Sequence, residues 1–379
     1  MDVTDPAAPG VATTTAVRRH DRLVGPDVTR GVALIGVVVM NYHGYLNGVG
    51  AAPDDAWYQS MFDPWKGALS TRFAATFVTV AGVGITLLTR RSVAGGDRSA
   101  ISDDRWRLTR RGVLLYLVGL VLNWVWGGTI LFFYGAFFVL GALLFTLRSR
   151  VVLIIGAAAA LAAAGIRWWA EARIKDGHSV AWLLSPSTLA TRSPRGLLFD
   201  TFINGTHPVL PWLAFLCAGI VLGRHLTQLP RLALIAGGAA LTAITYTISH
   251  LVRSGTDDPV TQIVFSTRYT DRGLLYTLGT LGTSVVAFCV LSWLGERFAR
   301  TPVVNALACA GRTTLSIYLL HVFVFRAVVN WWGLVQPTGL DTALVFALAF
   351  WVFAIIVATW WQGLFGAGPI ERIYRRFGG

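Results

Sequence analysis

The stretch TRGVALIGVVVMNYH, residues 29–43, decides the fold of this chain. A charged residue, Arg30, precedes an apolar run that continues to about Leu46, and Asn41, Tyr42 and His43 follow one another near the far end of that run. An apolar run bounded in this way is typical of a helix that crosses a membrane. We therefore expect a membrane helix with titratable chemistry at its far end.

The composition of the whole chain is also that of a membrane protein. Hydrophobic residues make up 54% of the 379 residues and charged residues 13%, and the mean hydropathy is +0.59. These values exceed what a soluble domain of this length carries. Apolar runs that can each cross about 30 Å of hydrocarbon recur along the chain. They span residues 31–46, 73–88, 112–127, 129–147, 151–169, 208–223, 232–251, 273–294, 313–332 and 342–365.

These runs predict an all-α fold, a polytopic transmembrane helical bundle of about 10–11 helices. With ten crossings, an even number, both termini are expected to be cytoplasmic. Residues 1–27 are predicted to form a disordered cytoplasmic tail, because their first part has no periodicity and little apolar bulk. Residues 28–379 are predicted to form a single transmembrane domain.

Arginines gather in the loops that this topology places in the cytoplasm. Seven of them lie between residues 90 and 111 against three aspartates, and further arginines follow the later crossings in the same alternation. This distribution obeys the positive-inside rule. Loop arginines beside anionic membrane lipid then explain the net charge of +13 with only two lysines, and nucleic-acid binding is not expected. The Arg-rich, Lys-poor composition favours a bacterial protein of the inner, plasma membrane.

Three segments are expected on the extracytoplasmic side, at about residues 47–71, 170–207 and 252–272. Loops of this size often carry function. They could form an outer rim that meets an extracytoplasmic substrate, or they could be solvated connectors. The sequence leaves both interpretations open.

His43 is the first candidate for catalysis. A histidine at the membrane boundary can accept a proton from an attacking hydroxyl or amine at neutral pH. Asn41 could hold its tautomer or bind a developing oxyanion, and Asp63 in the following segment could orient the imidazole. The competing interpretation makes His43 an interfacial anchor and Asp63 an ordinary solvated acid.

A second candidate site lies in the run 313–332. Tyr318 and His321 are three residues apart and share a helix face. Ionisable groups within a span usually face the bundle interior or a cavity. We assign Tyr318 and His321, together with His207 and Trp212 of the outer side, to substrate binding. A structural hydrogen bond between helices explains His321 equally well.

Four arginines are candidates for binding the phosphate groups of a cytosolic donor. They are Arg72, Arg110, Arg111 and Arg312. The positive-inside rule alone also explains the cytoplasmic arginines. The three cysteines show no metal-ligand spacing and no phosphate-binding GxxxxGK[ST] loop occurs. We therefore expect neither a metal site nor a permanently bound cofactor.

Five short segments, in order along the chain, carry a family resemblance. The first is RGVALIG at residues 30–36 with Asn41, and the second is the pair Arg110-Arg111 followed by WGGTILFFYG at residues 126–135. The others are HPVLPWLA at 207–214 with Gly223-Arg224, GRTTL at 311–315 with Tyr318-Leu319, and GPIE at 368–371. Together they resemble the bacterial YeiB-like (DUF418) proteins and the related heparan-α-glucosaminide N-acetyltransferase group. Thr129 stands where that pattern has an aspartate.

The resemblance implies a membrane-embedded acyltransferase. In the characterised branch, acetyl-CoA supplies the acyl group from the cytosolic side, a histidine beyond the first helix acts as base or acyl carrier, and the acceptor waits on the opposite side. His43 matches that histidine by position, although it follows Asn41 more closely than in that branch. The expected partners are acyl-CoA, membrane lipid and a hydroxyl or amine of an envelope glycan, glycolipid or small molecule, and a homodimer stays open.

Two other classes of function compete with this one. In a transporter or channel-like protein, His43 and His321 would line a polar path without covalent chemistry. In a membrane scaffold, acyl-CoA would not bind at all.

Overall fold

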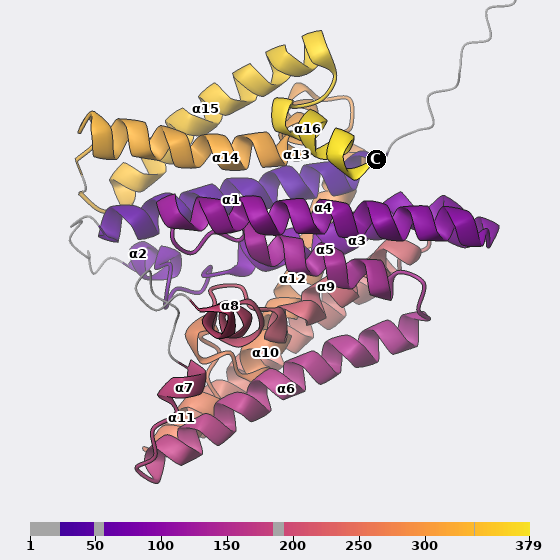
Figure 1. Cartoon of the computed structure of the whole chain (residues 1–379). Coiled ribbons are helices and arrows are strands. Elements are labelled where there is room, and N and C mark those ends of the chain that lie inside the picture. Colours follow the sequence, from indigo (N-terminus) through magenta and orange to yellow (C-terminus); the bar gives the residue numbers. More distant parts are fainter. Residues whose placement is uncertain (1–22, 49–56, 185–192, 337) are drawn as a thin grey trace, which may run out of the picture.

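The computed structural model describes residues 23–48, 57–184, 193–336 and 338–379, and Figure 1 draws them as ribbons. Within these ranges the chain is built of helices, without strands, so the expected all-α fold is confirmed. Residues 24–27 of the predicted tail form the first turn of helix α1 (Val24–Gly48), in which Pro26 suits a helix beginning. Residues 1–22 of that tail lie outside the described part.

Short connections join the helices (Figure 1). The longer ones, after α1, are α3 (Arg72–Gly95), α4 (Arg98–Val125), α5 (Leu131–Leu144), α6 (Ser149–Lys175), α9 (Val209–Arg224), α10 (Arg231–Ser254), α12 (Leu274–Arg297) and α15 (Leu340–Phe365). The shorter ones are α2 (Trp57–Phe62), α7 (Ala181–Leu184), α8 (Pro194–Phe199), η1 (Asp200–Asn204), α11 (Pro259–Val264), η2 (Tyr269–Asp271), α13 (Pro302–Arg312), α14 (Thr314–Phe325), η3 (Arg326–Trp331) and α16 (Pro369–Gly378).

Every one of the ten predicted apolar runs coincides with a helix, but two of them do not qualify as spans by themselves. Among the described residues, eight helices are long and apolar enough to cross a membrane, with α14 and η3 counted as one helix, Thr314–Trp331. A ninth is added if Pro194–Asn204 and Val209–Arg224, bent by 53°, form one span. Helix α5 is a shorter apolar helix of 14 residues whose side chains are mostly buried by protein. Hydropathy alone does not distinguish such a buried helix from a crossing. The side that each terminus faces stays a prediction.

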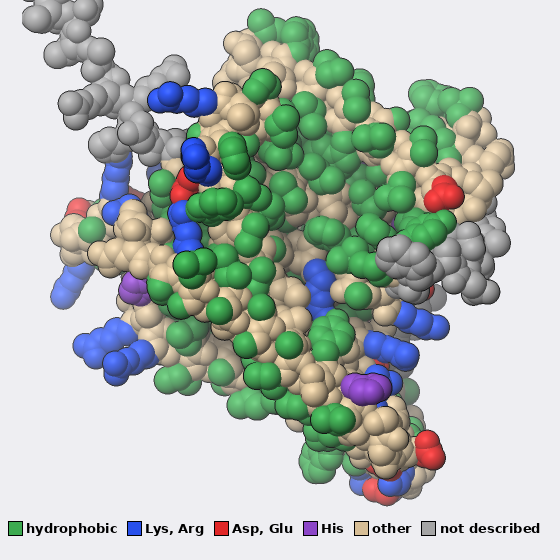
Figure 2. All heavy atoms as spheres, turned by 180° about the vertical axis from the view of Figure 1, so that it is seen from behind, with side chains coloured by type: hydrophobic (Ala, Val, Ile, Leu, Met, Phe, Trp, Pro, Cys, Tyr) green, Lys and Arg blue, Asp and Glu red, His purple; other side chains and the backbone are tan. Residues whose placement is uncertain are grey.

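The outer surface of the bundle is apolar where lipid is expected. Helices α6 and α10 turn large apolar side chains outward, among them Ile154, Leu161, Ile244 and Leu251. Figure 2 shows hydrophobic side chains over the broad middle of one face, with Lys and Arg mostly toward its edges. Such an apolar belt would be unfavourable in water, and it matches the hydrocarbon layer of a bilayer.

Helix α1 is the centre of the arrangement, since it contacts α3, α12, α13, α14 and α15. It meets α13 through glycines on both helices: a Cβ atom at Gly311 would overlap the carbonyl of Asp27, and one at Gly31 that of Leu307. Helices α3 and α9 meet in the same manner through Gly82 and Gly219. Small residues let helix backbones approach closely, which is how helices associate in lipid.

Replacing Gly219 by Ala should therefore destabilise the bundle, because the new methyl group would overlap the carbonyl of Thr79 on α3. Overpacking of this kind costs about 1–3 kcal/mol. The control is Gly237→Ala on α10, where a Cβ atom meets no other atom within 4 Å, and a gain of up to about 1 kcal/mol is expected there. Thermal unfolding in detergent compares the two variants, and an equal effect on both would contradict the packing.

Candidate functional site

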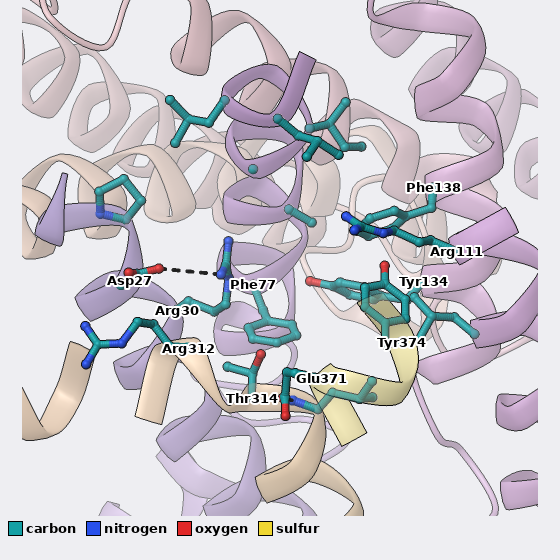
Figure 3. Close-up of a pocket in the computed structure, with 18 of the residues that line it drawn as sticks. Asp27, Arg30, Phe77, Arg111, Tyr134, Phe138, Arg312, Thr314, Glu371 and Tyr374 are labelled. Atoms are coloured by element: carbon teal, nitrogen blue, oxygen red, sulfur yellow. Dashed lines mark hydrogen bonds and ion pairs between the residues drawn. The ribbon is translucent and has the colours of Figure 1, made fainter. Parts of the chain in front are cut away.

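A basic cavity of about 960 Å³ opens beside the beginning of α1. Its walls come from α1, α3, α4, α5, the end of α13, α14 and α16, and Figure 3 shows many of the side chains that line it. Six arginines stand in these walls, namely Arg30, Arg90, Arg91, Arg111, Arg312 and Arg375.

The two acids among the described lining residues are already engaged. The carboxylate of Asp27 lies 3.7 Å from the Arg30 guanidinium. Glu371 of α16 accepts hydrogen bonds from the backbone amides of Leu315 (2.7 Å) and Ser316 (3.0 Å), at the beginning of α14. The cavity is therefore strongly positive and suited to a ligand with several negative charges.

Two residues that line this cavity also contain buried polar atoms without a protein partner. Among the described residues, the Tyr134 hydroxyl and Arg111 Nε are buried and have no hydrogen-bond partner. The Arg111 guanidinium lies 5.2 Å from the centre of the Tyr374 ring, and Figure 3 shows Arg111, Tyr134 and Tyr374 together on one side, with Arg30 and Arg312 across from them. A buried donor without a partner is costly, so these two groups mark a part of the wall whose hydrogen bonds the described residues do not complete.

A second cavity, of about 390 Å³, lies at the other end of α1 and is here called the outer cavity. Every described residue that lines it is uncharged. Aromatic side chains and neutral hydrogen-bonding groups share the lining with small apolar residues. The aromatic residues are Tyr45, Trp65, Phe73, Tyr269 and Tyr318, and the polar ones include Asn41, Thr71, Thr206 and His207.

The two cavities share a wall at Ile130 and Tyr318, which line both of them. The Tyr318 hydroxyl lies 2.9 Å from Thr129 Oγ1 and accepts a hydrogen bond from the backbone amide of Ile130 at 3.2 Å. Tyr318 belongs to α14, whereas Thr129 and Ile130 lie in the break between α4 and α5. One side chain and one helix break therefore separate the basic cavity from the neutral one.

His207 is the histidine that lines the outer cavity. Its Nδ1 lies 2.9 Å from Thr206 Oγ1, and the Thr206 hydroxyl donates to the carbonyl of Gly128 at 3.4 Å. The Thr206 oxygen is then the acceptor for Nδ1–H, so the lone pair of the neutral imidazole is on Nε2. Trp212 packs edge-on against the ring with 4.6 Å between centres. His207 is thus held in the tautomer in which Nε2 can accept a proton.

Arg272 holds the segment that carries His207. Its guanidinium donates to the carbonyls of Ile203 (2.6 Å), Asn204 (2.5 Å) and Gly205 (2.8 Å). Burial, helped by the nearby Arg167, lowers the pKa of Arg272 to about 10, which leaves it protonated at neutral pH. The contact also joins two of the predicted outer segments, 170–207 and 252–272. The sequence alone assigned no role to Arg272, because spacing along the chain does not connect it to residue 203.

Asn41 and His321 form a hydrogen-bonded pair between α1 and α14. Asn41 lines the outer cavity, and its Nδ2 lies 3.2 Å from His321 Nε2. His321 Nδ1 bonds to the carbonyl of Tyr318, and the Tyr42 hydroxyl donates to the carbonyl of His321 at 3.1 Å. His321 is fully buried. Its hydrogen bonds therefore hold the Asn41 side chain and the Tyr318 backbone in place.

His43 and Asp63 are engaged elsewhere. His43 is buried, and its Nδ1 lies 2.8 Å from the carbonyl oxygen of Phe62. Asp63 Oδ1 accepts from the backbone amides of Trp65 (2.8 Å) and Lys66 (2.7 Å) in a local turn. Asn41 is among the lining residues of the outer cavity, whereas His43 is in neither lining as described.

The structure brings together two of the four candidate phosphate-binding arginines. Arg111 and Arg312 line the basic cavity. Arg110 is exposed and reaches toward Gly379. Arg72 lies at the opposite end of α3, where its Nη2 donates to the Tyr246 hydroxyl at 2.9 Å. Sequence reasoning assigned no ligand-binding role to Arg30, Arg90, Arg91 and Arg375; their charge was visible, but their convergence depends on the packing of α1, α3 and α16.

The model of the heparan-alpha-glucosaminide N-acetyltransferase catalytic family matches residues 22–250, more than half of the chain. The chain belongs to this family. A second family model, a protein family of unknown function (DUF418), matches residues 218–378. The uncharacterized protein YeiB of Escherichia coli (strain K12) is 22% identical over 389 residues, which cover 94% of this chain and 96% of YeiB. The resemblance seen in the five sequence segments is confirmed.

Both matches contribute to the two cavities. The N-acetyltransferase catalytic match contains Asn41, Arg111 and His207, and the DUF418 match contains Tyr318 and Glu371. The wall at Ile130 and Tyr318 is therefore made by one residue from each match.

Replacing Arg272 by Gln should loosen the His207 segment, because three buried carbonyls would lose a charged donor. Hydrogen bonds to charged groups are worth about 1.5–3 kcal/mol each, so a loss of roughly 2 kcal/mol or more is expected in thermal unfolding. Arg268→Gln, at an exposed position nearby, is the control. An Arg272→Gln variant as stable as the Arg268→Gln variant would show that the hydrogen bonds of Arg272 to the three carbonyls do not stabilise the protein.

Proposed function

We propose that this protein transfers an acyl group, in the simplest case acetyl, from acyl-CoA in the basic cavity to an acceptor in the outer cavity. The observation that carries the proposal is the shared wall at Ile130 and Tyr318, since two cavities of different character reach the same point from opposite ends of α1. Membership of the N-acetyltransferase catalytic family supports acyl transfer as the chemistry.

The basic cavity suits the donor. Coenzyme A carries several phosphate groups on a long flexible arm that ends in the thioester. Guanidinium groups bind phosphate oxygens in bidentate geometry. Arg111 and Arg312, with Arg30, Arg90, Arg91 and Arg375, would hold the phosphates, and the arm would extend along the apolar wall made by Ile130 and Leu131. By the positive-inside rule this cavity faces the cytoplasm, where acyl-CoA is found.

His207 is the group best placed to act as general base in the outer cavity. The acceptor attacks the thioester carbonyl carbon, and Nε2 of His207 accepts the proton that the acceptor loses. Asn41 and Tyr318 are polar groups of the wall that could donate to the carbonyl oxygen as it becomes negative. The C–S bond then breaks, and the imidazolium returns the proton to the thiolate, which gives free CoA and the acylated acceptor.

This assignment moves the base from His43 to His207. His43 bonds to the α2 backbone and is outside the described linings. We infer that it holds the end of α2 against α1, and that Asp63 shapes the turn before α3. The proposed location is the bacterial plasma membrane, with the acceptor supplied from the extracytoplasmic side.

Replacing His207 by Ala should lower the turnover of acyl transfer by about 100-fold or more, because a general base contributes on the order of 10²–10⁴. The assay follows labelled acetyl-CoA with envelope extract and purified full-length protein, and thermal unfolding confirms that the variant is folded. The matched control is His43→Ala, with an expected loss below tenfold. If the His43 variant is inactive and the His207 variant active, the base is His43.

Replacing Arg111 by Gln should raise KM for acetyl-CoA at least tenfold with little change in kcat, since the loss affects binding of the donor. Arg110→Gln, at the adjacent exposed position, is the control and should change KM less than twofold. Equal effects of the two substitutions would remove the basic cavity as the donor site.

The same preparation separates an enzyme from a transporter. An enzyme places label on a new product in detergent, where no gradient exists. Uptake of an unmodified solute into vesicles, without any labelled product, would favour transport.

A further inference from the structure

We propose that the acceptor is an uncharged hydroxyl compound, such as a neutral sugar ring or polyol, and that the reaction in the outer cavity is O-acylation. This inference rests on the proposed function and names the acceptor class for the same site. It follows from the contrast between the two linings. The basic cavity has six arginines, whereas each described lining residue of the outer cavity is uncharged.

An ammonium group would be poorly accommodated in the outer cavity. Moving a charged amine out of water without a counter-ion costs several kcal/mol, so it would have to lose its proton before it could bind. Two arginines behind the wall oppose it further. Arg72 adjoins the lining residue Thr71, and Arg272 holds the carbonyls just before the lining residues Thr206 and His207. The carboxylate of Asp63 is already bonded to the backbone amides of Trp65 and Lys66.

A neutral hydroxyl compound matches the groups that are present. Tyr45, Trp65, Phe73 and Tyr269 supply flat apolar faces against which the C–H face of a sugar ring can pack. Asn41 and Thr206 supply donors and acceptors for its hydroxyls. The volume of about 390 Å³ lies near the lower end of the range for small-molecule sites, which limits the buried part of the acceptor to roughly one ring.

The step balances with the groups already named. The acceptor oxygen forms a bond to the thioester carbonyl carbon while its proton moves to His207 Nε2. The carbon–sulfur bond breaks, and the proton passes to the sulfur. The products are an O-acyl ester and CoA with a free thiol, so that no oxidant or further reactant is required.

The test uses sets of methyl glycosides in the gluco, galacto and manno series, each set with a neutral, an ammonium and a carboxylate member. Wild-type protein with labelled acetyl-CoA should acylate a neutral member at least tenfold faster than its charged counterparts, and the product should be an alkali-labile ester. Faster transfer to an ammonium or carboxylate member overturns the proposal. If no member is acylated while acetyl-CoA still raises the unfolding temperature, the proposed acceptor class is wrong and the proposed donor site is retained. Failure of acetyl-CoA to bind overturns the proposed function itself.

A matched pair of substitutions at Met40 tests the same inference by measuring how tightly the acceptor binds. Met40 lies on α1 and lines the outer cavity, and Met, Glu and Gln are similar in size and in helix propensity. In Met40→Glu the new carboxylate should tighten binding of the ammonium glycoside at least tenfold in calorimetric titration, whereas Met40→Gln should change it less than twofold. If wild-type protein already binds the ammonium member as tightly as the neutral one, the inference is wrong whatever the activities are.

Discussion

The hydrogen bonds around the Tyr318 hydroxyl are the interaction on which the site depends. The helical structure is interrupted between α4 and α5, and such an interruption leaves backbone amides without helical partners. In an apolar bundle those amides have to be satisfied by protein. Tyr318 accepts from the amide of Ile130, and Thr129 Oγ1 accepts from that of Leu131 at 3.3 Å while it also bonds to Tyr318. The same contacts close the wall between the two cavities, so stability of the break and separation of the cavities have one cause.

The sequence predicted the helices well because each one has to be apolar over most of its length. All ten predicted runs are helical, and Asn41, His207, Tyr318, Arg111 and Arg312 line the cavities. The length of α5 was overestimated because a helix buried by protein is as apolar as one that faces lipid. The sequence could not show that Arg72 lies apart from the basic cavity: Arg72 begins the 24-residue helix α3, whereas Arg90 and Arg91 line that cavity near the end of the same helix.

The direction of His43 shows what a closer use of helix geometry could have added. Each residue turns a helix by about 100°, so a residue two positions after Asn41 points to nearly the opposite side. Asn41, Gly44 and Tyr45 face the outer cavity, and His43 faces α2. The position of His207 could not be predicted in this way. It depends on Arg272, which lies 67–69 residues further along the chain than the three carbonyls that it fixes.

The close contact of α1 with α13 through Gly31 and Gly311 bears on how the chain assembles. These two helices are separated by about 250 residues of sequence, so the first span enters the bilayer long before its partner is made. Its polar residues Asn41 and Tyr42 meet His321 only after α14 has been inserted. Both cavities are thus late products of assembly, and a chain interrupted between α9 and α13 would be anchored in the membrane with neither site complete.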